Sequence, residues 1–246
     1  MQERVIIIIL YKYTGIIMSN LIEILKHKQW LWHGVDEKSN IHAQIKSSFL
    51  ELDQQLDGGF PEKGVIELRS PIGIGELRLL MPVLAAEYRQ RQQLCVFINP
   101  PGNINAQMLQ SCGVESEKVL VIYPKTIHDG LWSAEQCLKS GSCSSVLLWQ
   151  DSALAIHQVK RLQLACDTGQ SRQFIMRQEK SESMSLPFDL SITLNAQETG
   201  LVAKINKRKQ GWPSGEFVIN MAKSWPLLTC YASNRNLIPF PQKKVG

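Results

Sequence analysis

A short glycine-containing loop carries the clearest chemical signal in this sequence. The apolar residues 65–68 (VIEL) precede it, and the helical stretch 76–91 follows it. A strand, a glycine loop and a helix together form the setting of a phosphate-binding loop with the pattern G-x-x-x-x-G-K-[ST]. Backbone N–H groups at the start of such a helix bind anions. The eight corresponding residues here, 70–77, read SPIGIGEL.

Two substitutions remove the nucleotide chemistry from this loop. Glu76 stands where the phosphate-contacting lysine belongs, and Leu77 stands where the magnesium-binding hydroxyl belongs. At ~4 Å, a carboxylate repels each phosphate charge by about 4 kcal/mol at an effective dielectric constant of ~20. We therefore predict a vestigial phosphate loop without ATPase activity, formed by Ser70, Gly73, Gly75 and Glu76.

The other positions that an ATPase of this layout needs are also unsuited to catalysis. Asn99 and two prolines follow the apolar segment 94–98, where an acid would position the attacking water. Asp151 follows segment 146–149, and we expect it to cap the next helix rather than to hold magnesium. The five histidines and six cysteines show no ligand spacing. No catalytic residue, metal or cofactor is therefore predicted.

The surrounding pattern predicts the elements that position the loop. Apolar segments of strand length alternate with helical stretches, which indicates a mostly parallel sheet flanked by helices. Short strands beyond residue 172, without helices between them, predict an antiparallel C-terminal extension. The fold class is thus α/β, and the expected elements are strands at 65–68, 94–98, 119–123, 146–149, 174–176, 190–194, 201–205 and 217–221 and helices at 76–91, 104–112, 131–139 and 153–167.

The ends of the chain differ from this core. We expect residues 1–44 to form an N-terminal segment with a short helix at 19–33 and a linker, residues 45–222 to form the core domain, and residues 223–246 to form a basic tail. The apolar run 5–10 is too short to span a bilayer, and Met18 precedes an amphipathic stretch, so residues 1–17 are interpreted as an over-long start.

Scattered cysteines without a framework pattern favour a reduced, cytoplasmic protein that is not bound to a membrane.

Charge is distributed unevenly along the 246 residues. The net charge is +5, yet residues 200–246 hold eight basic residues against the single acid Glu216. A basic run at the end of a predicted strand could contact phosphates or an acidic partner, or it could be a solvated strand end. Trp132 is the best candidate for a protein contact on the helix at 131–139. The candidate partner or DNA contacts are Trp132, Lys204, Lys207, Arg208 and Lys209.

Several segments resemble a known family. Residues 45–53 (IKSSFLELD), 56–61 (LDGGFP) and 64–68 (GVIEL) resemble the opening segment of RecA-type recombinase cores. Residues 73–82 (GIGELRLLMP), with 131–136 (LWSAEQ) and 161–165 (RLQLA), resemble the ImuA family of RecA-like accessory proteins in bacterial translesion synthesis. This resemblance implies a RecA-like core, a role in the SOS response, and partnership with an ImuB-like protein, RecA and an error-prone polymerase.

A second resemblance gives the alternative function. Residues 97–100 (FINP) and 174–177 (FIMR) are similar to SulA-type inhibitors of cell division. That likeness implies binding to FtsZ and a block of septum formation. The RecA-like opening segment, which SulA-type chains lack, favours the ImuA type.

Overall fold

The computed structural model describes residues 44–178, 186–209 and 211–226. The chain divides into two units, residues 1–41 and residues 42–246, and all described residues belong to the second. The elements are β1 (Gln44–Ile45), α2 (Leu50–Gln55), β2 (Phe60–Pro61), β3 (Gly64–Arg69), α3 (Glu76–Arg91), β4 (Leu94–Ile98), α4 (Ala106–Ser111), a 3-10 turn (Ser116–Lys118), β5 (Val119–Ile122), α5 (Ile127–Lys139), β6 (Cys143–Trp149), α6 (Ile156–Gly169), β7 (Arg172–Arg177), β8 (Leu190–Gln197), β9 (Gly200–Arg208) and β10 (Glu216–Asn220).

An eight-stranded sheet organises the described unit, in the order β10-β9-β8-β3-β7-β6-β4-β5. Strands β5, β4, β6, β7, β3 and β8 pair in parallel, whereas β9 pairs antiparallel with β8 and β10. This confirms a mostly parallel sheet with an antiparallel C-terminal extension. The expected start of that extension was wrong, because β7 lies between β3 and β6 inside the parallel part. Among the described strands of this sheet, only the β8–β9 and β9–β10 pairings are antiparallel.

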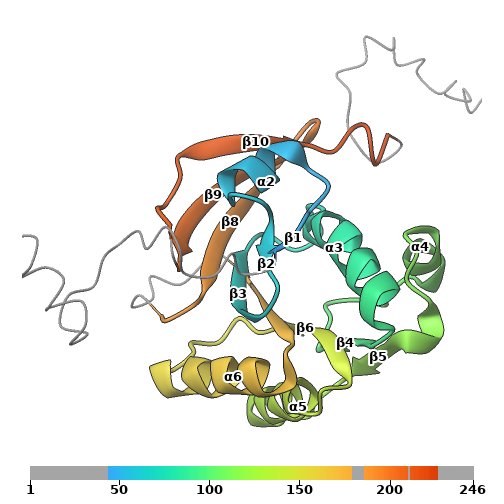
Figure 1. Ribbon diagram of the computed structural model, residues 1–246, viewed down its shortest axis with the longest axis vertical. Helices are drawn as coiled ribbons and strands as arrows, with labels where there is room; N and C mark the ends of the chain where they lie inside the picture. Colours follow the sequence, from blue (N-terminus) through green and yellow to red (C-terminus); the bar gives the residue numbers. More distant parts are fainter. Residues whose placement is uncertain (1–43, 179–185, 210, 227–246) are drawn as a thin grey trace, which may run out of the picture. The chain divides into compact units, whose positions relative to one another are not determined.

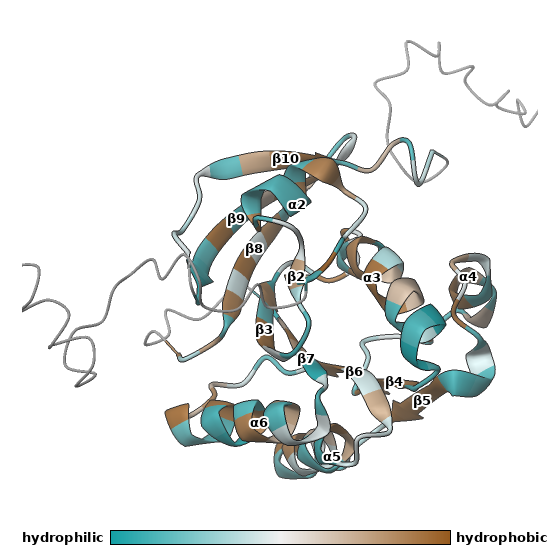
Figure 2. Cartoon of the chain, viewed as in Figure 1, coloured by the Kyte–Doolittle hydropathy of each residue, from teal (hydrophilic) through white to brown (hydrophobic). Residues whose placement is uncertain are grey.

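Helices cover both faces of the parallel part. One apolar cluster joins α2 and α3 to one face of the sheet and includes Leu52, Leu80 and Phe174. A second cluster joins α5 and α6 to the other face and includes Leu138, Val159 and Ile175. Figure 1 shows α3 and α5 on opposite sides of the strands, and Figure 2 shows the brown, apolar colouring of β4 and β5 between them. Burial on both faces explains why β4 reads as a continuous apolar run.

Several elements differ from the sequence-based prediction in their bounds or were not predicted. Helix α5 begins at Ile127, not at 131, because Thr126 and Asp129 form a capping box at its start. Helix α2 was not predicted, and neither was β1, which crosses the expected boundary at residue 44 and pairs with β2. The predicted helix at 19–33 and most of the basic tail lie outside the described residues, and the division at residues 44 and 222 stays a prediction.

Close packing between the two helices of one face depends on a glycine. A Cβ atom added to Gly169, the last residue of α6, would lie 1.7 Å from the carbonyl oxygen of Leu138 on α5. Any larger residue there must separate the two helix ends. Among the described residues, no helix is long and apolar enough to cross a membrane.

Candidate functional site

The predicted vestigial loop lies between β3 and α3, at the edge where the parallel strands end. Gly73 and Gly75 both have positive φ values, 83° and 111°, which a residue with a side chain rarely adopts. A Cβ atom on Gly75 would also lie 2.7 Å from the guanidinium of Arg78. Ser70 is buried, and its backbone N–H donates to the carbonyl oxygen of Arg177 on β7. The four predicted residues are therefore brought together in one loop.

The Glu76 carboxylate is folded back into this loop. Its Oε1 accepts a hydrogen bond from the Gly73 N–H at 3.1 Å, and its Oε2 accepts one from the Gly75 N–H at 3.0 Å. The Glu76 side chain is only 6% exposed. Backbone N–H groups of this kind are the donors that a phosphate uses in a phosphate-binding loop. The side chain thus satisfies, from within the chain, donors that a bound anion would otherwise take.

A small cavity of about 150 Å³ adjoins the loop, and Ile72, Glu76, Asn99 and Trp149 are among its lining residues. Ligand pockets usually measure ~300–1,000 Å³. Asn99 closes one side, because its side-chain N–H donates to the Trp149 carbonyl oxygen at 3.3 Å and its backbone N–H donates to the Ile122 carbonyl oxygen at 2.8 Å. Asn99 therefore ties the ends of β4, β5 and β6 together.

Asp151 does not cap α6, so that prediction was wrong. Its carboxylate accepts hydrogen bonds from the backbone N–H of Gln178 at 2.9 Å and from the Gln178 side chain at 3.2 Å. The residue that precedes α6 is Ala155, and its N–H donates to the Gln158 side chain. Asp151 thus joins the segment after β6 to the end of β7, beside the same cavity.

A buried charge network, which the sequence analysis missed, lies under the loop. Glu67 on β3 accepts hydrogen bonds from Arg177 at 3.0 Å and from Ser191 on β8 at 2.6 Å. Arg69 donates to the same carboxylate at 2.9 Å. The signal was present in the sequence as an acid within one apolar strand and an arginine after another. Only the pairing of β3 with β7 and β8 shows that they meet.

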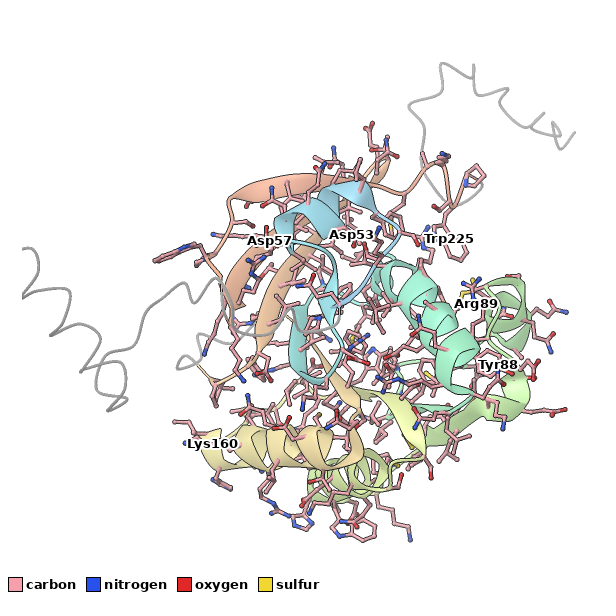
Figure 3. The ribbon with its side chains drawn as sticks, viewed as in Figure 1. Asp53, Asp57, Tyr88, Arg89, Lys160 and Trp225 are labelled. Atoms are coloured by element: carbon pink, nitrogen blue, oxygen red, sulfur yellow. The ribbon has the colours of Figure 1, made fainter. Side chains whose placement is uncertain are left out.

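The basic run is largely engaged in contacts within the chain. Lys207 donates to the Leu186 carbonyl oxygen at 2.8 Å, and Lys209 pairs with Asp189 at 3.2 Å. Arg208 donates to the Gln55 carbonyl oxygen and pairs with Asp57, which is labelled beside α2 in Figure 3. Lys204 is exposed on β9. Three of these four residues are therefore held by contacts within the chain.

Trp132 lies apart from the basic run, on the outer side of α5. It is 55% exposed and borders a shallow hollow of about 40 Å³ between α5 and α6. Glu135 in this hollow pairs with Lys139 and with Arg161 of α6, both at 2.5 Å. The Lys139 hydrogen bond, aided by Arg161, holds the pKa of the Glu135 carboxyl below its usual value, although burial acts in the opposite direction. Trp132 and the basic run are thus separate surfaces.

A cavity of about 340 Å³, larger than the one beside the loop, lies at the other end of the central strands and was not predicted from the sequence. Charged side chains around it pair with one another, as in Lys63 with Asp167 and Lys209 with Asp189. Asp189 also accepts hydrogen bonds from the Val65 N–H and from Gln163. These pairs leave the charges around the cavity nearly balanced. Within residues 44–178, 186–209 and 211–226, no three His, Cys, Asp or Glu side chains group as metal ligands.

Comparison with known proteins gives a distant but consistent likeness. RecA of Clostridium botulinum is 29% identical over 124 residues, which are 50% of this chain and 34% of that protein. RecA of Bacillus mycoides is 28% identical over 158 residues, 64% of this chain and 44% of that protein. The chain therefore matches less than half the length of these curated relatives. No family model matches it.

Among solved structures, SulA from Pseudomonas aeruginosa is 26% identical, with a TM-score of 0.38, over 46% of this chain and 97% of that one. The RecA similarity and the sheet described above agree with each other. The described unit has a RecA-like α/β core with an antiparallel extension.

Proposed function

We propose that this protein is an accessory factor of the SOS response of the ImuA type, a RecA-like module that binds partners and does not hydrolyse ATP. In this role it supports error-prone translesion synthesis together with an ImuB-like protein, RecA and an error-prone polymerase. The observation that carries the proposal is the position of the Glu76 carboxylate, which accepts hydrogen bonds from Gly73 and Gly75.

This contact argues against nucleotide binding, the usual chemistry of a phosphate-binding loop. A nucleotide phosphate would have to displace a buried carboxylate from its two N–H donors and would meet its charge at short range. The adjoining cavity, about 150 Å³, is smaller than ordinary ligand pockets. The loop also has an acceptor for its N–H groups without any ligand. These facts support a RecA-like scaffold that works through protein contacts.

Similarity to RecA supports the DNA-damage setting. The exposed indole of Trp132 supports a protein contact, because tryptophan is enriched among the residues that dominate binding energy at interfaces. Trp132 also lies in the segment 131–136 that resembles the ImuA family. We therefore place the partner-binding surface on the outer side of α5.

An assay with ATP tests the non-hydrolysing part of the proposal. Purified full-length chain is titrated with Mg-ATP by calorimetry, and phosphate release is measured with and without single-stranded DNA, with a RecA protein as the positive control. We expect no heat of binding at micromolar ATP and no DNA-stimulated release. Micromolar binding or stimulated hydrolysis would show that the loop is functional despite Glu76.

A binding assay tests the partner part. We expect the chain to bind a purified ImuB-like protein, and Trp132→Ala to weaken that binding about tenfold or more, which corresponds to ~1.4 kcal/mol. Leu164→Ala on α6 is the matched control, because this apolar side chain is also exposed, at 65%, but lies outside the hollow. If expression instead causes filamentation that altered FtsZ relieves, the protein is a SulA-type division inhibitor.

A further inference from the structure

Two cysteines meet where α5 turns into β6. Cys137 lies in the last turn of α5, and Cys143 is the first residue of β6. The turn between them includes Gly141, whose φ of 69° reverses the chain. Cys143 belongs to the apolar cluster under α5 and α6, and Cys137 packs against that cluster. The fold therefore brings together two thiols that are six residues apart in the sequence.

The turn itself fixes this arrangement. The hydroxyl of Ser140 donates to the Cys137 carbonyl oxygen at 2.8 Å and lies 3.8 Å from the Cys143 sulfur. The Ser142 N–H donates to the same hydroxyl at 3.1 Å. The interaction between the Cys137 and Cys143 side chains is the largest influence on the pKa of both thiols. Ser140 thus contacts both cysteines across the turn, through the Cys137 carbonyl oxygen and the Cys143 sulfur.

The contact changes the acidity of the thiols. Hydrogen bonds from Cys137 and Ser140 stabilise the thiolate of Cys143 and lower its pKa to about 7, although burial opposes this. The pKa of Cys137 is raised, first by its hydrogen bond to Cys143. Burial raises the pKa of Cys166 to about 12 and also raises that of Cys95. Since the thiolate is the reactive form of cysteine, Cys143 differs in this respect from Cys95 and Cys166, whose pKa values are raised.

We propose that Cys137 and Cys143 form an oxidant-sensitive pair that closes to an intramolecular disulfide. The co-reactant is a hydroperoxide, which reaches the buried Cys143 from the side where Cys137 is partly exposed. The Cys143 thiolate attacks the terminal peroxide oxygen and the O–O bond breaks, which releases an alcohol, or water from hydrogen peroxide, and leaves a sulfenic acid. The Cys137 sulfur then attacks the sulfenic sulfur, the S–S bond forms, and hydroxide leaves as water. Two thiols lose two electrons and two protons in all, and the peroxide gains them.

Such a bond suits the predicted compartment. In a reducing cytoplasm, disulfides are rare, and those that form are usually transient and redox-sensing. This one would join the end of α5, the helix that carries Trp132, to the first residue of β6. It would close a short loop within one structural unit, and thiol reductants would reopen it by thiol–disulfide exchange.

Peptide mapping tests the proposal directly, because Lys139 lies between the two cysteines. The folded full-length chain is treated with hydrogen peroxide, free thiols are blocked with N-ethylmaleimide, and trypsin is added. Without the disulfide, residues 126–139 and 140–160 separate as two alkylated peptides. With it, they remain joined and separate only after reduction. We expect the joined pair to be the main disulfide product and to form faster in the folded chain than in denaturant.

Substitutions provide the controls. Cys137→Ser and Cys143→Ser should each abolish the joined pair, whereas Cys112→Ser, which alters another half-buried thiol, should leave its yield unchanged. Circular dichroism verifies that each variant is folded. If Cys143→Ser does not fold, Cys137→Ser alone serves as the control. The proposal is overturned if peroxide oxidises Cys112 while residues 126–139 and 140–160 stay separate. It is equally overturned if Cys137 is found joined to a cysteine other than Cys143.

Discussion

The carboxylate of Glu67 on β3 accepts a 3.0 Å hydrogen bond from the guanidinium of Arg177 on β7, and both side chains are almost fully buried. Charges inside a protein are costly unless they are paired and their remaining hydrogen-bonding groups are satisfied. Ser191 and Arg69 supply further donors to the same carboxylate. The central strand is thereby joined to both of its neighbours by side chains as well as by backbone.

Removing one partner from this pair is expected to be strongly destabilising. Arg177→Met and Glu67→Gln should each lower the free energy of unfolding by ~3–5 kcal/mol, because the other group stays buried without full compensation. The double variant should lose less than the sum of the two. Urea denaturation measures all three, with Arg161→Met, which removes an arginine that is 59% exposed, as the control. Losses below about 1 kcal/mol in both single variants would contradict this account.

The Glu76 carboxylate is expected to stabilise the loop in which it lies. Glu76→Ala leaves the N–H groups of Gly73 and Gly75 without this acceptor, so the free energy of unfolding should fall by ~1–3 kcal/mol. Glu76→Gln keeps one carbonyl oxygen as an acceptor and should lose less. Amide hydrogen exchange at Gly73 and Gly75 should accelerate in Glu76→Ala and remain slow in Glu198→Ala, which alters an exposed acid. Unchanged exchange in Glu76→Ala would mean that the carboxylate does not hold the loop.

The pKa shift of Glu135 predicts part of the acid sensitivity. Because its pKa is lower in the folded chain than the unfolded value of about 4.3, the group stabilises the fold above that value, and the stabilisation is lost as pH falls through the folded pKa. Lys139 and Arg161 are 41% and 59% exposed, so the effect should stay below about 1 kcal/mol. Glu135→Gln should therefore flatten the stability curve below about pH 4. Thermal melts between pH 3 and pH 7 measure this, and a curve parallel to that of the unsubstituted chain would refute it.

The basic run should separate into a structural and a surface part. Arg208→Gln breaks contacts with Gln55 and Asp57 and should cost on the order of 1 kcal/mol. Lys204→Gln alters an exposed residue and should change stability by less than about 0.5 kcal/mol. If the run contacts DNA, Lys204→Gln should weaken that binding at low salt without affecting stability. Equal affinity for single-stranded DNA at low salt would identify Lys204 as a solvated strand end.

Local sequence patterns predicted most of the helices and strands. They did not predict which strands lie next to each other in the sheet. The strand at 94–98 was predicted with the bounds of β4, because its apolar run is uninterrupted. Strand β7 was placed in the wrong part of the sheet, because its neighbours β3 and β6 are set by long-range packing. The Glu67–Arg177 ion pair was not predicted for the same reason, because 110 residues separate the two in the sequence.

The loop illustrates a different limit. Sequence reasoning identified Glu76 as a lysine replacement that repels phosphate, which depends only on charge. Its role as an acceptor for Gly73 and Gly75 depends on the backbone path of the loop, with positive φ at both glycines. Residue types thus predicted that the loop lacks the phosphate-binding lysine. The fold was needed to find that the Glu76 carboxylate accepts the hydrogen bonds of the loop.

The central position of β3 also affects when the chain can fold during its synthesis. This strand is the first of the eight-stranded sheet to leave the ribosome, yet both of its neighbours, β7 and β8, follow more than 100 residues later. Until then its apolar residues have no strand to pair with, and contacts of such high sequence separation slow folding. We therefore expect the nascent chain to acquire protease resistance only once β8 has emerged, and to depend on chaperones before that point.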